Sequence, residues 1–232
     1  MIGFYDYTVL LTYASLISAT LGILICMDGQ GHPFIGVFFL MISGLCDAFD
    51  GKVARTKKNR TIQEQRYGIQ IDSLADLVAF GVLPACIGNS MLRVLPSMPE
   101  ISRVHVSRMT AWPFVSIFYT IMSIYVLSAL VRLAYFNVEE EMRNEKHEGT
   151  RKYYTGLPVT SASLIFPILL SFQYITPFDI TSLYFVAMLI VSCLFIMPIP
   201  VKKPGTRAIL IMIVIGSIDF FTMLWLYIMK LR

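Results

Sequence analysis

The chain has 232 residues, of which 56% are hydrophobic and only 15% are charged. A water-soluble domain carries about 25% charged residues, so this composition excludes a soluble globular protein and a disordered chain. The same shortage of charge argues against a nucleic-acid-binding protein, although the net charge is +4. The four cysteines lie in apolar stretches without metal-ligand or disulfide spacing. We therefore expect an integral membrane protein.

Seven apolar stretches are long enough to cross a bilayer, which takes about 20 helical residues. We expect them to form an all-α polytopic transmembrane helix bundle, a single transmembrane domain over residues 1–232. In chain order they cover residues 7–27, 33–50, 69–92, 112–136, 157–175, 178–197 and 208–229. The later boundaries are soft and the fourth stretch is long, so counts of six and eight spans stay open.

Basic residues are concentrated in alternate connections between these stretches. The largest group lies between the second and third stretches, and further groups follow the fourth and the sixth. Lysine and arginine accumulate in cytoplasmic loops. We therefore expect a multi-pass protein of the cell membrane with its N-terminus and the loop after residue 50 facing the cytoplasm. Three arginines between the third and fourth stretches are a mild exception.

Four aspartates lie at the ends of two predicted spans, where acidic residues are rare and mark functional sites. Asp47 and Asp50 end the second span, and Asp72 and Asp76 lie near the start of the third. Spacings of three and four residues place each pair on one helix face. A hairpin through the basic loop therefore brings the two pairs together, and facing carboxylates repel each other unless cations compensate them.

Two kinds of cation could compensate this charge. Salt bridges to Lys52 or Arg55 would make the cluster a structural ion-pair network. Alternatively, oxygen ligands without a nearby His or Cys select hard divalent ions. We expect the metal site, because Gly51, Ala54 and Gly68 leave room for a ligand beside the aspartates. Arg55 has the planar fork of donors that suits a phosphate.

These residues form one pattern of fixed spacing: Asp47-x2-Asp50-Gly51-x2-Ala54-Arg55-x12-Gly68-x3-Asp72-x3-Asp76. The pattern resembles the signature of the CDP-alcohol phosphotransferase family, integral membrane enzymes of phospholipid synthesis. Residues 71–85 (IDSLADLVAFGVLPA), 131–137 (VRLAYFN) and 156–158 (GLP) resemble its phosphatidylserine synthase subfamily. The resemblance ends near residue 158, and the loop between Arg55 and Gly68 is about one helical turn longer than is usual in the family.

This resemblance implies transfer of a phosphatidyl group from CDP-diacylglycerol to L-serine, with release of CMP. It also implies two divalent cations, Mg²⁺ or Mn²⁺, and a homodimer among membrane lipids. Carried over residue by residue, Asp47, Asp50 and Asp72 would be metal ligands. Asp76 would ligate or adjoin the second cation and act as the general base.

The resemblance also assigns residues to the substrates. The residues that would contact the CDP moiety are Gly51, Ala54, Arg55 and Gly68. Arg132 and Asn137, at the cytoplasmic end of the fourth span, would contact the acceptor or a phosphate. For Arg132, a topology-setting or snorkelling arginine is an equally good interpretation.

Two alternatives stay open. The first is the same chemistry on another alcohol, such as glycerol 3-phosphate or inositol phosphate, because the signature does not choose the acceptor. The second is a divalent-cation transporter that uses the four aspartates for translocation. Against a transporter, the aspartates gather at one membrane edge and no inverted repeat is evident.

Overall fold

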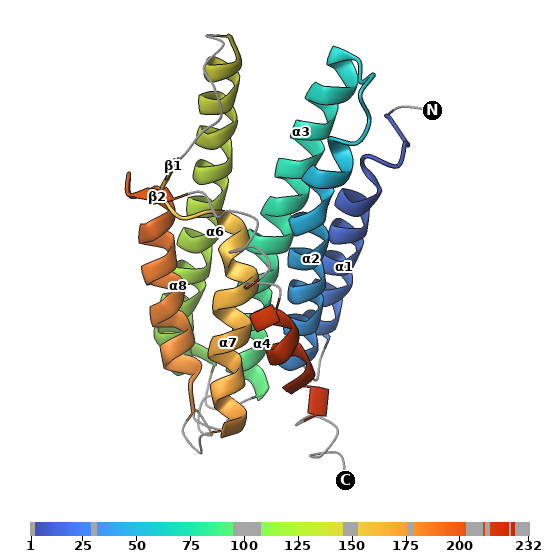
Figure 1. Cartoon of the computed structure of the whole chain (residues 1–232). Helices are drawn as coiled ribbons and strands as arrows, with labels where there is room; N and C mark the ends of the chain where they lie inside the picture. Colours follow the sequence, from blue (N-terminus) through green and yellow to red (C-terminus); the bar gives the residue numbers. More distant parts are fainter. Residues whose placement is uncertain are drawn as a thin grey trace.

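The computed structural model describes residues 3–28, 32–94, 108–145, 153–175, 179–202, 211, 214–222 and 224–225. Most of these residues are helical, and the helices pack side by side as an all-α bundle (Figure 1). The elements in chain order are α1 (Leu10–Met27), α2 (Pro33–Ala54), α3 (Ile62–Asp76), the π-helical turn η1 (Leu77–Val82), α4 (Leu83–Val94), α6 (Arg108–Glu145), β1 (Tyr153–Thr155), the 3-10 turn η2 (Val159–Ser161), α7 (Ala162–Ile175), α8 (Thr181–Ile196) and β2 (Pro200–Lys202).

Within the residues that the structure describes, four helices are long and apolar enough to span a membrane: Leu10–Met27, Pro33–Ala54, Ile62–Arg93 and Val115–Arg143. The apolar helices α7 and α8 are shorter, with 14 and 16 residues. In the predicted seventh span, residues 211, 214–222 and 224–225 are helical, and its other residues lie outside the described part. The prediction of an all-α polytopic membrane protein is therefore confirmed.

Three helices are longer than the apolar stretches that predicted them, and the first of these, α2, continues from residue 50 to Ala54. The third helix starts at Ile62 instead of residue 69, because Thr61 and Glu64 form a capping box before it. The fourth runs from Arg108 to Glu145, well beyond residues 112–136. Near its polar end, Arg143 pairs with Glu140 at 3.1 Å. Hydropathy locates the bilayer core, whereas capping and surface charge pairs extend a helix beyond that core.

Helices α1 and α2 pack side by side (Figure 1). Serine hydroxyls form hydrogen bonds between them. The Ser43 hydroxyl donates to the Ser15 carbonyl at 3.0 Å, and the Ser18 hydroxyl donates to the Phe39 carbonyl at 2.9 Å. Small residues at helix contacts allow this close approach in membranes. The contact fixes the position of the end of α2 that carries Asp47 and Asp50.

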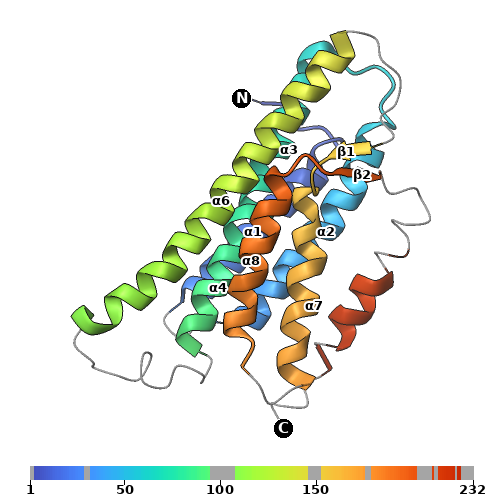
Figure 2. The ribbon, with the colours of Figure 1, turned by 90° about the vertical axis from the view of Figure 1, so that its left-hand side faces the viewer.

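A large aromatic core lies between α4, α6, α7 and α8. The rings of Tyr125 and Phe166 lie 5.6 Å apart, and those of Phe166 and Tyr184 lie 4.9 Å apart. All three side chains are fully buried. Figure 2 shows α6 crossing the face of the bundle beside α4 and α8. This core joins the later helices to the helix that carries Asp72 and Asp76.

One short two-stranded sheet among the described residues was not predicted. Strand β1 pairs antiparallel with β2, with Tyr154 opposite Val201. Gly156 follows β1 with a φ of +81°, a conformation that favours glycine. A Cβ there would also lie 3.0 Å from the Phe195 carbonyl oxygen. This sheet thus holds the start of the fifth predicted span against the end of α8.

Candidate functional site

Three carboxylates meet where α2 and α3 come together. Asp47 and Asp50 lie in the last turns of α2, and Asp72 lies near the end of α3. One oxygen from each of the three lies within 4.8 Å of the others. Asp50 is buried, with 8% of its surface exposed, and the other two are half-buried. The prediction that the hairpin brings the aspartate pairs together is confirmed for these three side chains.

Asp76 lies one helical turn beyond Asp72 and is 8% exposed. It ends α3 and directly precedes the π-helical turn η1. It does not belong to the group of three carboxylates found among the described residues. Asp76 is therefore buried next to the three carboxylates without belonging to their group, which is compatible with a separate role.

The predicted ion-pair alternative finds no support in the described part of the chain. There, neither Lys52 nor Arg55 forms an ion pair with any of the four aspartates. The Lys52 ammonium instead lies 5.2 Å from the centre of the Phe49 ring. Carboxylates that are gathered without an ion-pair partner in this part of the chain form an oxygen-only donor set that fits a divalent metal ion.

Thr12 is a neighbour of the site that sequence analysis missed. Its hydroxyl donates to Asp50 Oδ2 at 3.4 Å and is buried with it. The available signal was a row of hydroxyl residues three apart in the first span, Thr12, Ser15 and Ser18. Ser15 and Ser18 donate hydrogen bonds to the backbone of α2. Thr12 lies in the first turn of α1, next to the end of α2, and so reaches Asp50.

The predicted CDP contacts lie on α2, directly after it and on α3, the helices that carry the aspartates. Gly51 and Arg55 are exposed, whereas Ala54 and Gly68 are half-buried. An Arg55 Nη atom lies 4.0 Å from where a Cβ on Gly51 would be. Arg60, which was not predicted, covers Gly68 so closely that a Cβ there would lie 2.7 Å from its guanidinium. Two guanidinium groups therefore lie beside the two glycines of the pattern.

The longer loop between Arg55 and Gly68 is fastened to the N-terminal segment, residues 3–9. Lys57 Nζ lies 2.6 Å from Asp6 and 2.8 Å from Glu64. One ammonium thus joins the N-terminal segment, the loop and the start of α3. Lys57 therefore attaches the longer loop to the segments on both sides of it.

Tyr67 adds a second attachment of the N-terminal segment, next to Gly68. The ring of Tyr67 meets that of Phe4 edge-on, with centroids 5.3 Å apart. Its hydroxyl shares a 3.0 Å hydrogen bond with the hydroxyl of Tyr13, which also donates to the Phe4 carbonyl at 3.0 Å. The turn of α3 that carries Gly68 is therefore held by α1 and by the segment before it.

The Asp6–Lys57 pair makes the stability of this attachment depend on pH. The hydrogen bond from Lys57 lowers the pKa of Asp6 from 3.8 to about 2. A carboxylate with a lowered pKa stabilises the fold above its unfolded pKa, and this contribution is lost as pH falls through about 2. We expect Asp6→Asn to lower the melting temperature by a few degrees at most near pH 6, as for a surface ion pair. The difference should disappear between about pH 4 and pH 2, and a thermal-unfolding series that shows a constant difference would contradict this.

The two predicted acceptor contacts have different surroundings. The Asn137 amide donates at 2.8 Å to the hydroxyl of Ser73, the residue after Asp72. Asn137 thus lies beside the helix that carries two of the aspartates. Arg132 is 4% exposed, and its Nε donates to the Leu157 carbonyl at 3.2 Å. Because it is buried against the start of the fifth predicted span, Arg132 does not snorkel to the membrane surface.

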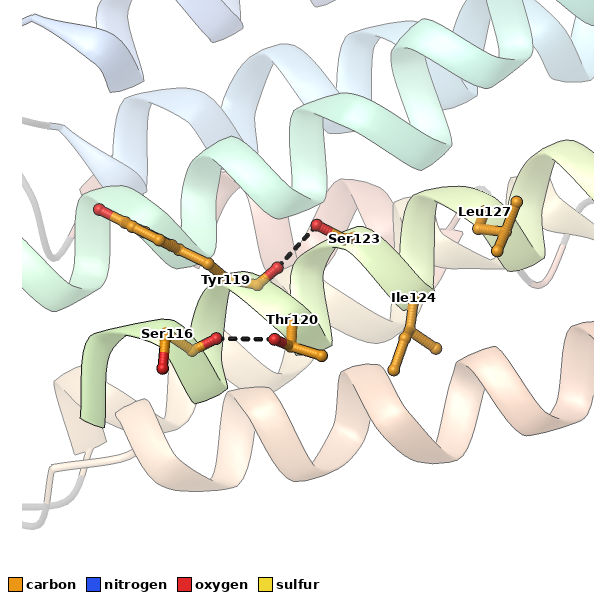
Figure 3. A pocket seen from close by; sticks show the side chains of 6 residues that line it. All are labelled: Ser116, Tyr119, Thr120, Ser123, Ile124 and Leu127. Carbon is orange, nitrogen blue, oxygen red and sulfur yellow. Dashed lines mark hydrogen bonds between the residues drawn. The ribbon is translucent and has the colours of Figure 1, made fainter. Parts of the chain in front are cut away.

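A shallow pocket on α6 lies apart from these residues. Figure 3 shows its lining on one side of α6: Ser116, Tyr119, Thr120, Ser123, Ile124 and Leu127. Two of its hydroxyls, those of Thr120 and Ser123, donate at 2.8 Å to carbonyls four residues earlier. None of the predicted site residues lines it, and the hydroxyls of Thr120 and Ser123 form hydrogen bonds within α6.

Comparison with known proteins extends the similarity beyond the motifs. The family model for CDP-alcohol phosphatidyltransferase matches residues 8–197, and so includes α7 and α8. The chain is 32% identical to a CDP-diacylglycerol–serine O-phosphatidyltransferase of Saccharomyces cerevisiae over 60% of this chain and 43% of that protein. A protein of the same name from Mycobacterium bovis is 26% identical, over 75% and 54% of the two chains. An archaetidylserine synthase of Methanothermobacter thermautotrophicus is 29% identical, over 73% and 58%. The chain spans about half the length of these curated relatives.

Proposed function

Because this chain belongs to the CDP-alcohol phosphatidyltransferase family, we propose that it transfers a phosphatidyl group from CDP-diacylglycerol to L-serine, forming phosphatidylserine and CMP. The observation that carries the proposal is the group of three carboxylates on α2 and α3, at the spacing of the family signature. Serine as acceptor is supported by the names of the relatives and by the segments around Asp72 and Arg132.

The three carboxylates fit a divalent cation because they offer only oxygen donors, which Mg²⁺ and Mn²⁺ prefer. We assign Asp47, Asp50 and Asp72 as ligands and place Asp76 beside a second cation. Two such cations would supply charge neutralisation at the donor diphosphate and at the leaving CMP. Thr12 would help to orient Asp50 by donating a hydrogen bond to its Oδ2.

The proposed reaction is a direct displacement. The hydroxyl oxygen of serine forms a bond to the phosphorus that carries the diacylglycerol, and the bond from that phosphorus to the CMP oxygen breaks. The hydroxyl proton passes to the carboxylate of Asp76, whose burial beside the metal ligands supports this assignment. Asn137 and Arg132 are assigned to the acceptor, because a buried guanidinium suits a carboxylate.

Gly51, Ala54, Arg55 and Gly68 are assigned to the CDP moiety. The two glycines let the substrate approach the backbone, and the exposed Arg55 side chain is free to bond two phosphate oxygens at once. Arg55→Lys keeps the charge but loses this paired geometry. We expect it to raise the KM for CDP-diacylglycerol about tenfold while the KM for serine changes little. Steady-state kinetics in detergent measure both constants, and an unchanged donor KM would contradict the contact.

We place the aspartates and the basic loop on the cytoplasmic side of the cell membrane, with the N-terminus inside. The support is the excess of Lys and Arg in the loop between α2 and α3, many of them exposed. We also propose a homodimer. The exposed face of α6, which carries hydroxyl residues in a segment long enough to span the membrane, supports a helix contact there. Crosslinking through a cysteine introduced at Thr120 tests this contact.

The acceptor is tested by identifying the lipid product. Purified protein is supplied with CDP-diacylglycerol and one alcohol at a time: L-serine, glycerol 3-phosphate or inositol phosphate. Phosphatidylserine as the main product supports the proposal. A phosphatidyl product formed with glycerol 3-phosphate or inositol phosphate instead would support the same reaction with a different acceptor.

A further inference from the structure

The helix that carries Asp72 and Asp76 changes its winding directly after Asp76. Residues Leu77–Val82 form a π-helical turn, in which the Leu83 amide donates to the Val78 carbonyl five residues earlier. Pro84 explains this widening. It has no N–H for the Phe80 carbonyl four residues before it, and its ring would clash with that carbonyl in an α-helix. Short π-helical turns are frequent at functional sites.

Two buried tyrosines donate hydrogen bonds to this stretch of backbone. The Tyr125 hydroxyl donates to the Phe80 carbonyl at 2.7 Å, and the Tyr184 hydroxyl donates to the Pro84 carbonyl at 2.8 Å. Both side chains are fully buried. Gly81 lets α6 come this close, since a Cβ there would lie 3.3 Å from the Cβ of Ala129. Tyr125 therefore bonds inside the π-helical turn, and Tyr184 bonds just after it.

The turn determines how the two halves of this helix face their neighbours. One additional residue in a turn rotates everything after it by about 100° relative to a continuous α-helix. As a result, α3 directs Asp72 toward the aspartates of α2, while α4 buries Ile87 and Met91 completely in the core. Asp76 is the last residue before the turn. Because α4 is buried in the core, the turn sets how α3, with Asp76 at its end, is rotated relative to α4.

We propose that Tyr125 is a positioning residue for the reaction: by donating to the Phe80 carbonyl, it anchors the π-helical turn to α6 and so keeps Asp76 aligned with the acceptor hydroxyl. The inference rests on the proposed function, in which Asp76 accepts the proton. Misplacement of a reacting group by about 1 Å costs up to a hundredfold in rate. We therefore expect Tyr125→Phe to lower kcat by about tenfold to a hundredfold, with the donor KM within twofold of wild type.

Tyr184→Phe is the matched control, because it removes an equally buried hydroxyl from a neighbouring carbonyl beyond the turn. Each variant leaves one buried carbonyl without its hydroxyl donor, so both should lose similar thermal stability. Only Tyr125→Phe should lose kcat. Equal kcat losses in the two variants, or wild-type kcat in Tyr125→Phe, would overturn the inference.

A double variant separates positioning from stability. Adding Pro84→Ala to Tyr125→Phe provides an N–H that the Phe80 carbonyl can accept in an ordinary α-helical bond. We expect the double variant to regain part of the lost thermal stability, because the Phe80 carbonyl again has a donor. It should not regain kcat, because Tyr125 no longer anchors the turn to α6. Recovery of kcat together with stability would overturn the inference.

Hydrogen exchange of the amides in Leu77–Val82 gives a readout that does not need activity. Wild-type protein that released no CMP would overturn the proposed function, and exchange would then decide the inference about the turn. Faster exchange there in Tyr125→Phe than in Tyr184→Phe supports it. Equal exchange in the two variants would overturn it.

Discussion

Asp72→Asn should lower kcat for CMP release by about a thousandfold. The substitution removes a negative charge from the three carboxylates whose oxygens lie within 4.8 Å of one another. A divalent cation held by these oxygens would stabilise charge that develops at the diphosphate. Losing one preorganised contact of this kind lowers kcat by about a hundredfold to a thousandfold. Binding of Mn²⁺, measured by the loss of the free-ion signal in electron paramagnetic resonance, should weaken in parallel.

Asp28→Asn is the matched control for this variant. It makes the same chemical change just after the opposite end of α1 from Thr12 and the aspartate site. It should keep wild-type kcat and Mn²⁺ binding. Wild-type Mn²⁺ binding in Asp72→Asn would show that the three carboxylates do not act as a metal site.

Asp76→Asn should lower kcat by about a hundredfold to ten-thousandfold, the range for removal of a general base. Unlike Asp72→Asn, it should leave Mn²⁺ bound to the other three aspartates, because Asp76 is not part of that group. The donor KM should also change little. Steady-state kinetics combined with Mn²⁺ binding on the same preparation separate the two roles.

A different pattern would reassign Asp76. If Asp76→Asn lost Mn²⁺ binding as strongly as Asp72→Asn, Asp76 would be a ligand first. If it turned over at near the wild-type rate, another group would accept the proton. Thermal unfolding of each variant shows whether a loss of activity reflects a loss of fold.

Much of the fold and the centre of the site could be predicted from the sequence because both follow from local patterns. Apolar length located the helices, and residue spacing placed Asp47 and Asp50 on one face of α2. The hairpin joining α2 and α3 then left few ways to arrange Asp72. Short-range geometry of this kind is fixed by helix periodicity.

The missed features depend on contacts between segments far apart in the chain. Thr12 meets Asp50 across 38 residues, and Lys57 meets Asp6 across 51. Tyr125 reaches the Phe80 carbonyl across 45 residues. Pro84 signalled a disturbed helix, but it did not show that a tyrosine would supply the missing donor. Such partners are determined by tertiary packing, which residue spacing alone does not encode.

The measurement that tests the central claim most directly is CMP release by detergent-purified protein supplied with CDP-diacylglycerol, L-serine and Mn²⁺ or Mg²⁺. We predict release that depends on serine, stops when a chelator is added and resumes when excess cation is restored. Asp72→Asn should release CMP about a thousandfold more slowly under the same conditions. Folded wild-type protein that released no CMP with serine, glycerol 3-phosphate or inositol phosphate would contradict the account.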